Sequence, residues 1–420
     1  MTGTLGAQRP IVEGDDESRS SGRRGDIQGL RAVAVLVVVL NHVGVPGFGG
    51  GFIGVDVFFV ISGYVITRML VRTGERREAR DWFVDFYAKR ARRIVPAATL
   101  VVVCTVIATF EFTNFIRGAQ ILPDATAAAL FLANFHFIAT GSDYAMLGSD
   151  PSALQHYWSL AVEEQFYLLW PLLVLIAVAV VARVEKLALR QTLGTMLVVA
   201  ITASYWHSVV ATPEDGTAAY FSPFTRAWEL AIGCLIAVVE PSLVRRLSAA
   251  SSAVLGWAGA TAIAWAVIAL DEDAVFPGWI AAIPVLGAGA LIVSGMVPSG
   301  AVPGRLLSTT VPRYVGDLSY SLYLVHWPLF TIVAIRMDDD VAVTTQVLLV
   351  CAAFAGAAVM YHFFEDPIRK STFLAARPWT SMAIVPVGMA TVFVVAAIER
   401  WRWDLTEPLI QQLFSPMGKG

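Results

Sequence analysis

The sequence carries little charge for its length. Only 15% of the 420 residues are Asp, Glu, Lys or Arg, whereas about 25% is usual in soluble globular chains. Hydrophobic residues make up 56%, and the mean hydropathy is +0.65. One water-soluble core of this length cannot hide so much apolar surface, so the composition excludes a soluble globular protein and predicts a chain solvated by lipid. The formal net charge of −3 indicates no particular partner.

Cysteine is scarce as well. Cys104, Cys234 and Cys351 each lie inside an apolar run, without metal-ligand spacing and without evident disulfide partners. We expect all three to pack in the core as small hydrophobic residues. The histidines lack the close pair spacing on one helix that a metal site needs, so the sequence predicts no metal.

A signal-peptide cleavage pattern is missing. Residues 1–26 are polar and are predicted to form a disordered cytoplasmic tail. The apolar run that follows contains Arg31, Asn41 and His42 and no small-residue cleavage site, so we interpret it as a retained first helix. No internal repeat is evident.

Apolar runs of the length that a bilayer requires recur along the chain. They predict an all-α polytopic membrane protein with about ten core transmembrane helices and one appended helix. The predicted spans are 27–45, 52–70, 95–112, 160–182, 193–211, 226–240, 252–270, 279–297, 318–336, 342–364 and 381–398.

The loops alternate in charge, which orients the spans by the positive-inside rule. The alternation holds only if the apolar segment 122–140 does not cross the membrane. We therefore predict that 113–158 is an extracytoplasmic loop with a re-entrant or interfacial helix, and that the amino terminus is cytoplasmic and the carboxyl terminus extracytoplasmic. Cysteine accessibility that placed residue 150 in the cytoplasm would contradict this topology. The basic loops lie at 72–93, 183–190, 245–246, 305–313 and 369–370, and the acidic ones at 214–215, 271–273 and 338–340.

Ionisable side chains inside predicted spans are candidates for function, because burying them in a bilayer costs free energy. Arg31 and His42 are eleven residues apart in the first span, which is about three turns and about 16 Å along one helix face. They cannot bind the same small group, but they can bind opposite ends of a long ligand. Alternatively, Arg31 snorkels to the headgroups and His42 is an interfacial histidine.

Two further groups flank these residues in the predicted topology. Asp56 begins the second span after a glycine-rich turn, so its carboxylate either orients His42 or caps the helix. Arg90 and Arg93 precede the third span. Such a cluster either marks a cytoplasmic loop under the positive-inside rule or binds anionic lipid. Alternatively, it recognises a polyphosphate.

The segment 155–167 enters the fourth span and contains His156, Trp158, Glu163, Glu164 and Tyr167. Aromatic belts explain the aromatic residues, but they do not explain two adjacent carboxylates at the start of a span.

Two later spans also contain ionisable residues. Arg226 and Glu229 have the spacing of a helical ion pair. They are interpreted either as a structural ion pair or as part of a functional site. His326 either packs against Trp327 or takes part in catalysis.

Taken together, these segments resemble membrane acyltransferase family 3. The resemblance runs from Gly25 to Arg369, and its most specific parts are Gln28–Ala32 with His42, Gly54–Gly63 and Trp158–Tyr167. It implies a transmembrane domain over 27–370 that uses a cytoplasmic acyl donor, usually acyl-CoA, to O-acylate carbohydrate such as peptidoglycan or another envelope glycan. The residues that it indicates are Arg31, His42, Arg90 and Arg93, followed by Glu163, Glu164 and His326.

One branch of this family carries an extra helix and an extracytoplasmic SGNH hydrolase-like domain. The extra span is present here, as a linker and helix over 371–398, and a tail at 399–420 is predicted to be extracytoplasmic. The Gly-Asp-Ser motif of an SGNH domain is absent. Either the chain ends naturally or it is a fragment, and an SGNH-type domain or protein is then a partner.

These residues suggest a division of roles. Arg31, Arg90 and Arg93 would bind the phosphates of the donor, and His42 would be the general base, oriented by Asp56, Glu163 or Glu164. The candidate substrate-binding residues are His156, Trp158, Tyr167, Arg226 and His326.

The expected setting is the bacterial inner membrane, with lipid and a carbohydrate or glycolipid acceptor as partners and no nucleic acid. The alternative is a transporter or flippase of an acylated glycan or lipid. A lipid-binding scaffold is a third option. Only an enzyme would release free CoA from labelled acyl-CoA.

Overall fold

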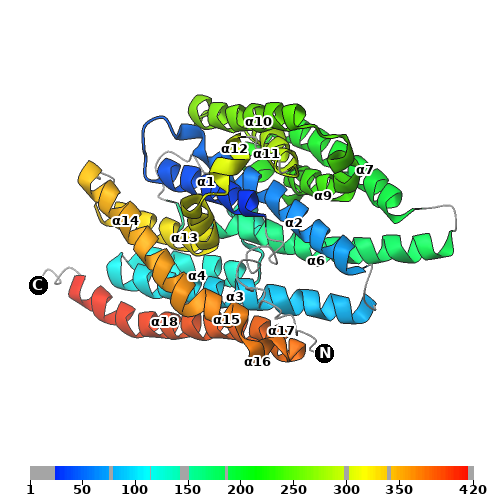
Figure 1. Cartoon of the computed structure of the whole chain (residues 1–420). Helices are drawn as coiled ribbons and strands as arrows, with labels where there is room; N and C mark the ends of the chain where they lie inside the picture. Colours follow the sequence, from blue (N-terminus) through cyan, green and yellow to red (C-terminus); the bar gives the residue numbers. More distant parts are fainter. Residues whose placement is uncertain are drawn as a thin grey trace, which may run out of the picture.

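The chain folds as a bundle of helices (Figure 1). The computed structural model describes residues 24–74, 79–113, 115–141, 151–184, 188–297, 302–337 and 342–414, and within these ranges it contains no strand. Among the described residues, nine helices are long and apolar enough to cross a membrane. This confirms an all-α polytopic membrane protein. The long helices are α2 (Gly54–Gly74), α3 (Ala79–Phe112), α6 (Tyr157–Arg183), α7 (Leu189–Ala211), α9 (Pro223–Arg246), α10 (Ala249–Ala269), α13 (Thr310–Arg336), α14 (Val343–Met360) and α18 (Ile384–Phe414).

Two of the eleven predicted spans form shorter or more polar helices. Helix α1 (Gly25–His42) has 18 residues, but Asp26, Arg31 and its last two residues, Asn41 and His42, lower its hydropathy. Helix α11 (Ala282–Ser294) has only 13 residues. At least half of the residues of each helix are buried.

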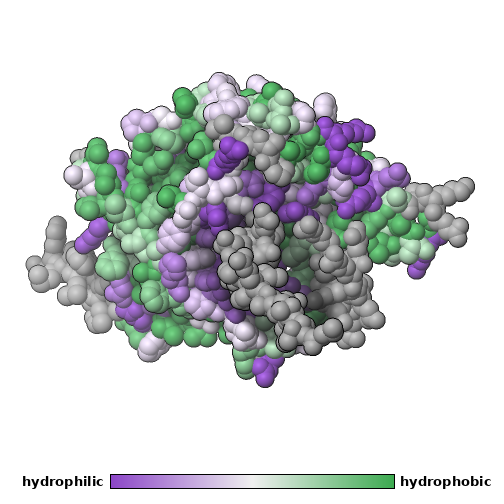
Figure 2. All heavy atoms as spheres, viewed as in Figure 1, coloured by the Kyte–Doolittle hydropathy of each residue, from purple (hydrophilic) through white to green (hydrophobic). Residues whose placement is uncertain are grey.

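The outside of the bundle is apolar. Hydrophobic residues cover much of the face in Figure 2, and large side chains such as Val254 and Phe363 are 69% and 80% exposed. Such a surface is stable in lipid and not in water. Cys104 and Cys351 lie on this surface, so the prediction of core packing is correct only for Cys234.

The charged loops gather at two ends of the bundle. At one, which we call the arginine end, Arg24 donates to the Ile292 carbonyl and Gly25 lies against Arg313. At the other, the histidine end, Gly49 lies against the backbone of Asp271, and the Gly278 amide donates to Thr212. These contacts group basic residues at one end and the acidic loop at 271–273 at the other, in agreement with the charge alternation. The side of the membrane that each end faces stays a prediction. Predictions for 1–23, 76–77, 186 and 338–340 fall outside the described residues.

The described parts of the segment 113–158 contain two short helices. These are α4 (Phe115–Ala129) and α5 (Ala133–Thr140), separated by a turn in which Phe131 has a φ of 54°. The Phe131 carbonyl accepts a hydrogen bond from Gln165 on α6, which anchors the turn. Neither helix is among those long enough to cross a membrane.

Helix α18, the predicted additional span, packs against α3. Gly388 packs closely against Thr99 of α3. Near the arginine end, the buried Arg92 of α3 donates to Ser381 of α17 (Pro378–Met382), and at the opposite end Arg402 pairs with Glu111. Figure 1 shows α18 lying along α3.

Glycines bring α2 and α9 into close contact. A Cβ atom built on Gly63 would lie 1.9 Å from the Leu230 carbonyl oxygen, and one built on Gly233 would lie 2.0 Å from the Val60 oxygen. Small residues at such a crossing allow two backbones to approach, as in many membrane helix pairs.

Replacing Gly233 with Ala is therefore expected to push α2 and α9 apart and to lower the thermal unfolding temperature in detergent, at a cost of about 1–3 kcal/mol. Gly194→Ala is the matched control, because no atom lies within 4 Å of a Cβ at this position on α7. Equal unfolding temperatures for both variants would contradict the close contact.

Candidate active site

Helices α1 and α13 run side by side in the same direction. Arg31 Nε donates to Ser319 Oγ at 3.1 Å, and His42 Nδ1 lies 3.0 Å from His326 Nε2. Ser319 and His326 are seven residues apart, which is two turns and so the same helix face. Arg31 and His42 therefore project from one face of α1, as predicted, and both face α13.

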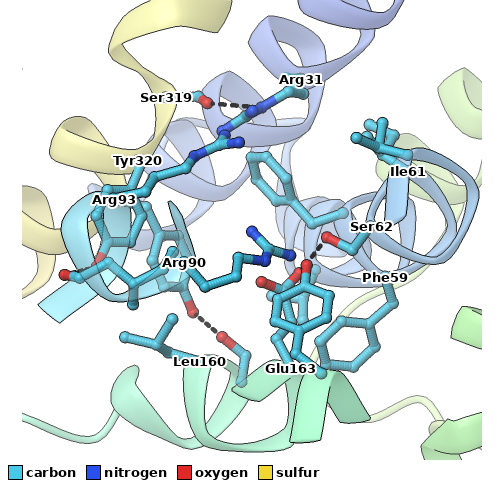
Figure 3. Close-up of a pocket in the computed structure, with 17 residues that line it drawn as sticks. Arg31, Phe59, Ile61, Ser62, Arg90, Arg93, Leu160, Glu163, Ser319 and Tyr320 are labelled. Carbon is cyan, nitrogen blue, oxygen red and sulfur yellow. Dashed lines mark hydrogen bonds between the residues drawn. The ribbon is translucent and has the colours of Figure 1, made fainter. Parts of the chain in front are cut away.

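A pocket at the arginine end receives side chains from five helices, namely α1, α2, α3, α6 and α13. It has about 770 Å³ of empty space, part of which is open to solvent. Figure 3 shows Arg31 and Arg93 approaching this space from one side and Arg90 extending into it. The polar side chains in its wall are Arg31, Ser62, Arg90, Arg93, Ser159, Glu163, Tyr167, Ser319, Tyr320 and Tyr323.

Arg90 and Arg93 lie three residues apart on α3 and so share a face of that helix. The Arg90 guanidinium stacks on the Tyr167 ring, with its Cζ atom 3.5 Å from the ring centroid. The Nε atoms of both arginines are buried and have no hydrogen-bond acceptor among the described residues. Buried guanidinium donors without acceptors suit a site for an anionic group, because charge-assisted hydrogen bonds to phosphate are strong.

The two carboxylates at the start of α6 belong to this end of the site. Glu163 accepts a hydrogen bond of 2.6 Å from Ser62, and both residues line the arginine pocket. Glu164 follows Glu163 on α6, and its Oε1 atom is buried without a hydrogen-bond donor among the described residues. The expectation that Glu163 or Glu164 orients His42 is therefore wrong. Tyr167 likewise lies under Arg90 and away from the histidine end.

Three histidines gather at the histidine end. The ring centroids of His156 and His326 are 6.0 Å apart, and His156 Nε2 lies 3.2 Å from the Leu324 carbonyl oxygen. His326 is fully buried and His156 is 2% exposed, whereas His42 is partly exposed. Trp327 contacts His42 edge-on, with centroids 4.4 Å apart.

The arginine pocket and the histidines adjoin at Tyr323. The Tyr323 hydroxyl lies 2.6 Å from Ser159 Oγ, and both side chains line the pocket. The same tyrosine ring lies 5.6 Å from the His326 ring, measured between centroids. One tyrosine side chain thus lies between the arginines and the histidine pair.

Arg226 occupies a separate, fully buried position. Its guanidinium nitrogens lie 3.3 Å from carboxylate oxygens of Asp56 and of Glu229, and all three residues are 0% exposed. The prediction that Asp56 orients His42 is wrong, because α2 turns this carboxylate toward α9. Four aromatic rings enclose the guanidinium, with centroids 5.3–5.7 Å from its Cζ atom: Phe59, Trp158, Tyr220 and Phe276.

This burial supports the structural alternative for Arg226 and Glu229. Replacing Arg226 with Leu would leave two buried carboxylates without their cation, which is expected to destabilise the fold by about 3–5 kcal/mol. Thermal unfolding in detergent measures the loss. Arg400→Ala serves as the control, because its pair with Asp404 is exposed and such pairs contribute about 0–1 kcal/mol. Arg226→Leu with normal unfolding but no activity would instead indicate substrate contact.

Sequence reasoning missed Ser62, Ser319 and Tyr323. A signal existed for the last two, because Ser319, Tyr323 and His326 follow a helical spacing and share one face of α13. No comparable signal pointed to Ser62, whose importance comes from its hydrogen bond to Glu163 on another helix.

The fold and the buried polar groups at its two ends define a polytopic membrane protein with a site that reaches from arginines to histidines. A family model described as an acyltransferase domain matches residues 24–362, and the chain belongs to this family.

Several curated proteins are similar to the chain over most of its length. The peptidoglycan O-acetyltransferase OatA of Listeria monocytogenes is 32% identical over 363 residues, which are 83% of this chain and 56% of that protein. The putative peptidoglycan O-acetyltransferase YrhL of Bacillus subtilis is 30% identical over 397 residues, 89% of this chain and 60% of the relative. The O-acetyltransferase OatA of Staphylococcus aureus is 30% identical over 362 residues, which are 83% of this chain and 58% of that protein. The chain thus spans 56–60% of these relatives' lengths, and no solved structure matches it.

Proposed function

We propose that the chain is a membrane-embedded O-acyltransferase. It moves an acetyl group from cytoplasmic acetyl-CoA to a hydroxyl group of an extracytoplasmic cell-wall carbohydrate. The observation that carries this proposal is the parallel pairing of α1 and α13, which holds Arg31 and His42 on one face at the two ends of the site. The similar proteins are named as peptidoglycan O-acetyltransferases, which supports acetyl as the group and peptidoglycan as the acceptor.

The donor substrate is long, with phosphates at one end and a thioester at the other. Arg90 and Arg93 bind the phosphates through Nε–H donors that have no acceptor among the described residues, and Arg31 lies beside them. The pantetheine arm extends past Tyr323 toward the histidine end. About 16 Å along α1 separates the two ends, which matches an extended arm.

His42 acts as general base at the far end. It takes the proton of the acceptor hydroxyl while the hydroxyl oxygen bonds to the thioester carbon. The carbon–sulfur bond then breaks, and the proton passes from His42 to the leaving sulfur. The products are the O-acetylated carbohydrate and CoA with a free thiol, so His42 returns to its starting state. His156, whose ring centroid lies 6.0 Å from that of His326, remains the candidate contact to the acceptor.

The test uses the purified protein in lipid vesicles with acetyl-CoA labelled in the acetyl group and soluble peptidoglycan fragments as acceptor. We expect free CoA thiol to appear and label to enter the fragments, detected by mass spectrometry. A folded, inserted protein that releases no CoA and adds no acetyl group would overturn the proposal. Movement of glycan across the bilayer without CoA release would favour the flippase alternative.

A further inference from the structure

We propose that His326 is a positioning residue that fixes the tautomer of His42, so that Nε2 of His42 is its basic nitrogen. The inference about the tautomer follows from hydrogen-bond geometry at the histidine end. Its catalytic consequence rests on the proposed function.

The first step concerns the proton on His326. Its Nδ1 atom lies 3.0 Å from the carbonyl oxygen of Leu322, one turn earlier on α13. A carbonyl oxygen only accepts hydrogen bonds, so His326 Nδ1 must carry the proton of this contact. The Nε2 atom of a neutral ring is then an acceptor.

The second step concerns the charge of His326. The ring is fully buried, and the rings packed around it belong to His42, His156, Tyr323 and Phe330. None of these neighbours carries a negative charge that would compensate a buried imidazolium, and a buried charge without compensation is expensive. His326 is therefore neutral in the resting state.

The third step assigns the proton on His42. Its Nδ1 atom lies 3.0 Å from His326 Nε2, and the two ring planes differ by only 4°. The ring centroids are 5.2 Å apart, so the rings lie edge to edge in nearly one plane and nitrogen points at nitrogen. Because His326 Nε2 accepts, His42 Nδ1 must donate. The lone pair of neutral His42 therefore lies on Nε2.

A second contact holds the His42 ring in this orientation. Trp327 lies against His42 at an interplanar angle of 62°, and its indole N–H donates to the Ser152 carbonyl at 2.8 Å. Ser152 precedes the turn that leads into α6, so the indole ring is anchored from outside α13. A 180° flip of the His42 ring would break the bond to His326 while Trp327 stays in place.

His326 thus takes the position that a carboxylate often occupies beside a catalytic histidine. When His42 Nε2 accepts the hydroxyl proton, Nδ1–H remains bonded to His326 Nε2, which shares the positive charge through that hydrogen bond. The proton then leaves from His42 Nε2 to the CoA sulfur. His326 gains and loses no proton over the cycle and touches neither substrate, which differs from its predicted role in substrate binding.

The direct test is nitrogen NMR of the full chain in lipid nanodiscs with ring-labelled histidine. Only six histidines are present, and His42→Gln and His326→Gln identify two of the signals. Above neutral pH, we expect His42 to be protonated at Nδ1 and not at Nε2, and His326 likewise. A His42 signal showing the opposite tautomer would overturn the inference. This measurement needs no turnover, so it stays decisive even if the proposed function fails.

The kinetic test compares two substitutions of His326. In His326→Gln the side-chain oxygen can still accept from His42 Nδ1, whereas in His326→Leu nothing replaces the acceptor. We expect His326→Leu to lower kcat on the order of 10- to 100-fold with an unchanged KM for acetyl-CoA, and His326→Gln to recover most of this loss. His207→Gln, at an exposed position on α7, is the control. Equal losses in the Gln and Leu variants, or a raised KM with unchanged kcat, would refute the positioning role.

Discussion

Replacing His42 with Gln is expected to abolish acetyl transfer, with kcat falling on the order of 10²- to 10⁴-fold. The physical reason is the loss of the only group in the proposal that accepts the hydroxyl proton. Binding of acetyl-CoA should survive, because the arginine pocket lies about 16 Å away along α1. CoA thiol release measures turnover, and equilibrium binding of labelled CoA measures the donor site.

The control for this prediction is His207→Gln, which changes an exposed histidine on α7 and should leave both measurements unchanged. Thermal unfolding of His42→Gln shows whether the variant is folded. Wild-type turnover in a folded His42→Gln would refute the assignment of the base. Loss of donor binding together with turnover would indicate instead that His42 contacts the donor.

The second large effect is expected from Arg90→Gln/Arg93→Gln. Each charge-assisted hydrogen bond to a phosphate contributes about 1.5–3 kcal/mol, so the double variant should raise the Kd for acetyl-CoA at least about 100-fold. Lys at both positions should recover only part of the affinity, because an ammonium group lacks the planar donors of arginine. Titration with labelled CoA and with dephospho-CoA shows which phosphate is affected.

Lys89→Ala is the matched control on the same helix. Lys89 is exposed and pairs with Asp85, so its removal should change donor affinity little. An unchanged Kd for acetyl-CoA in the double arginine variant would mean that Arg90 and Arg93 set the membrane topology or bind lipid rather than the donor. The two largest predictions are also separable, because the arginine variant acts on Kd and KM whereas the histidine variant acts on kcat.

Much of the fold was predictable because it depends on local properties of the chain. The length and hydropathy of each run set which segments form helices. Every predicted span overlaps a helix, although α3, α13 and α18 extend well beyond the predicted bounds. The shared face of Arg31 and His42 follows from helical periodicity alone. The alternation of loop charge predicted which loops lie together, and the structure groups them at two ends.

The predicted residue partners that were wrong concern packing between distant segments. Asp56 follows His42 by fourteen residues, yet its carboxylate pairs with Arg226 because the close approach of Gly63 and Gly233 brings α2 onto α9. The segment 122–140 does not form one spanning helix, as predicted, but its turn at Phe131, whose carbonyl accepts from Gln165, was not foreseen. Neither effect is visible in a local sequence pattern.

The sequence by itself determined that this protein is a membrane-embedded bundle with Arg31 toward one end of its first helix and His42 at the other. Only the tertiary structure decided which residues surround them: Glu163 with the arginines, and His326 with His42. Hydropathy and helical period are fixed by neighbouring residues in the chain. The partner of a buried polar group depends on how whole helices cross, and that is settled by packing over the entire bundle.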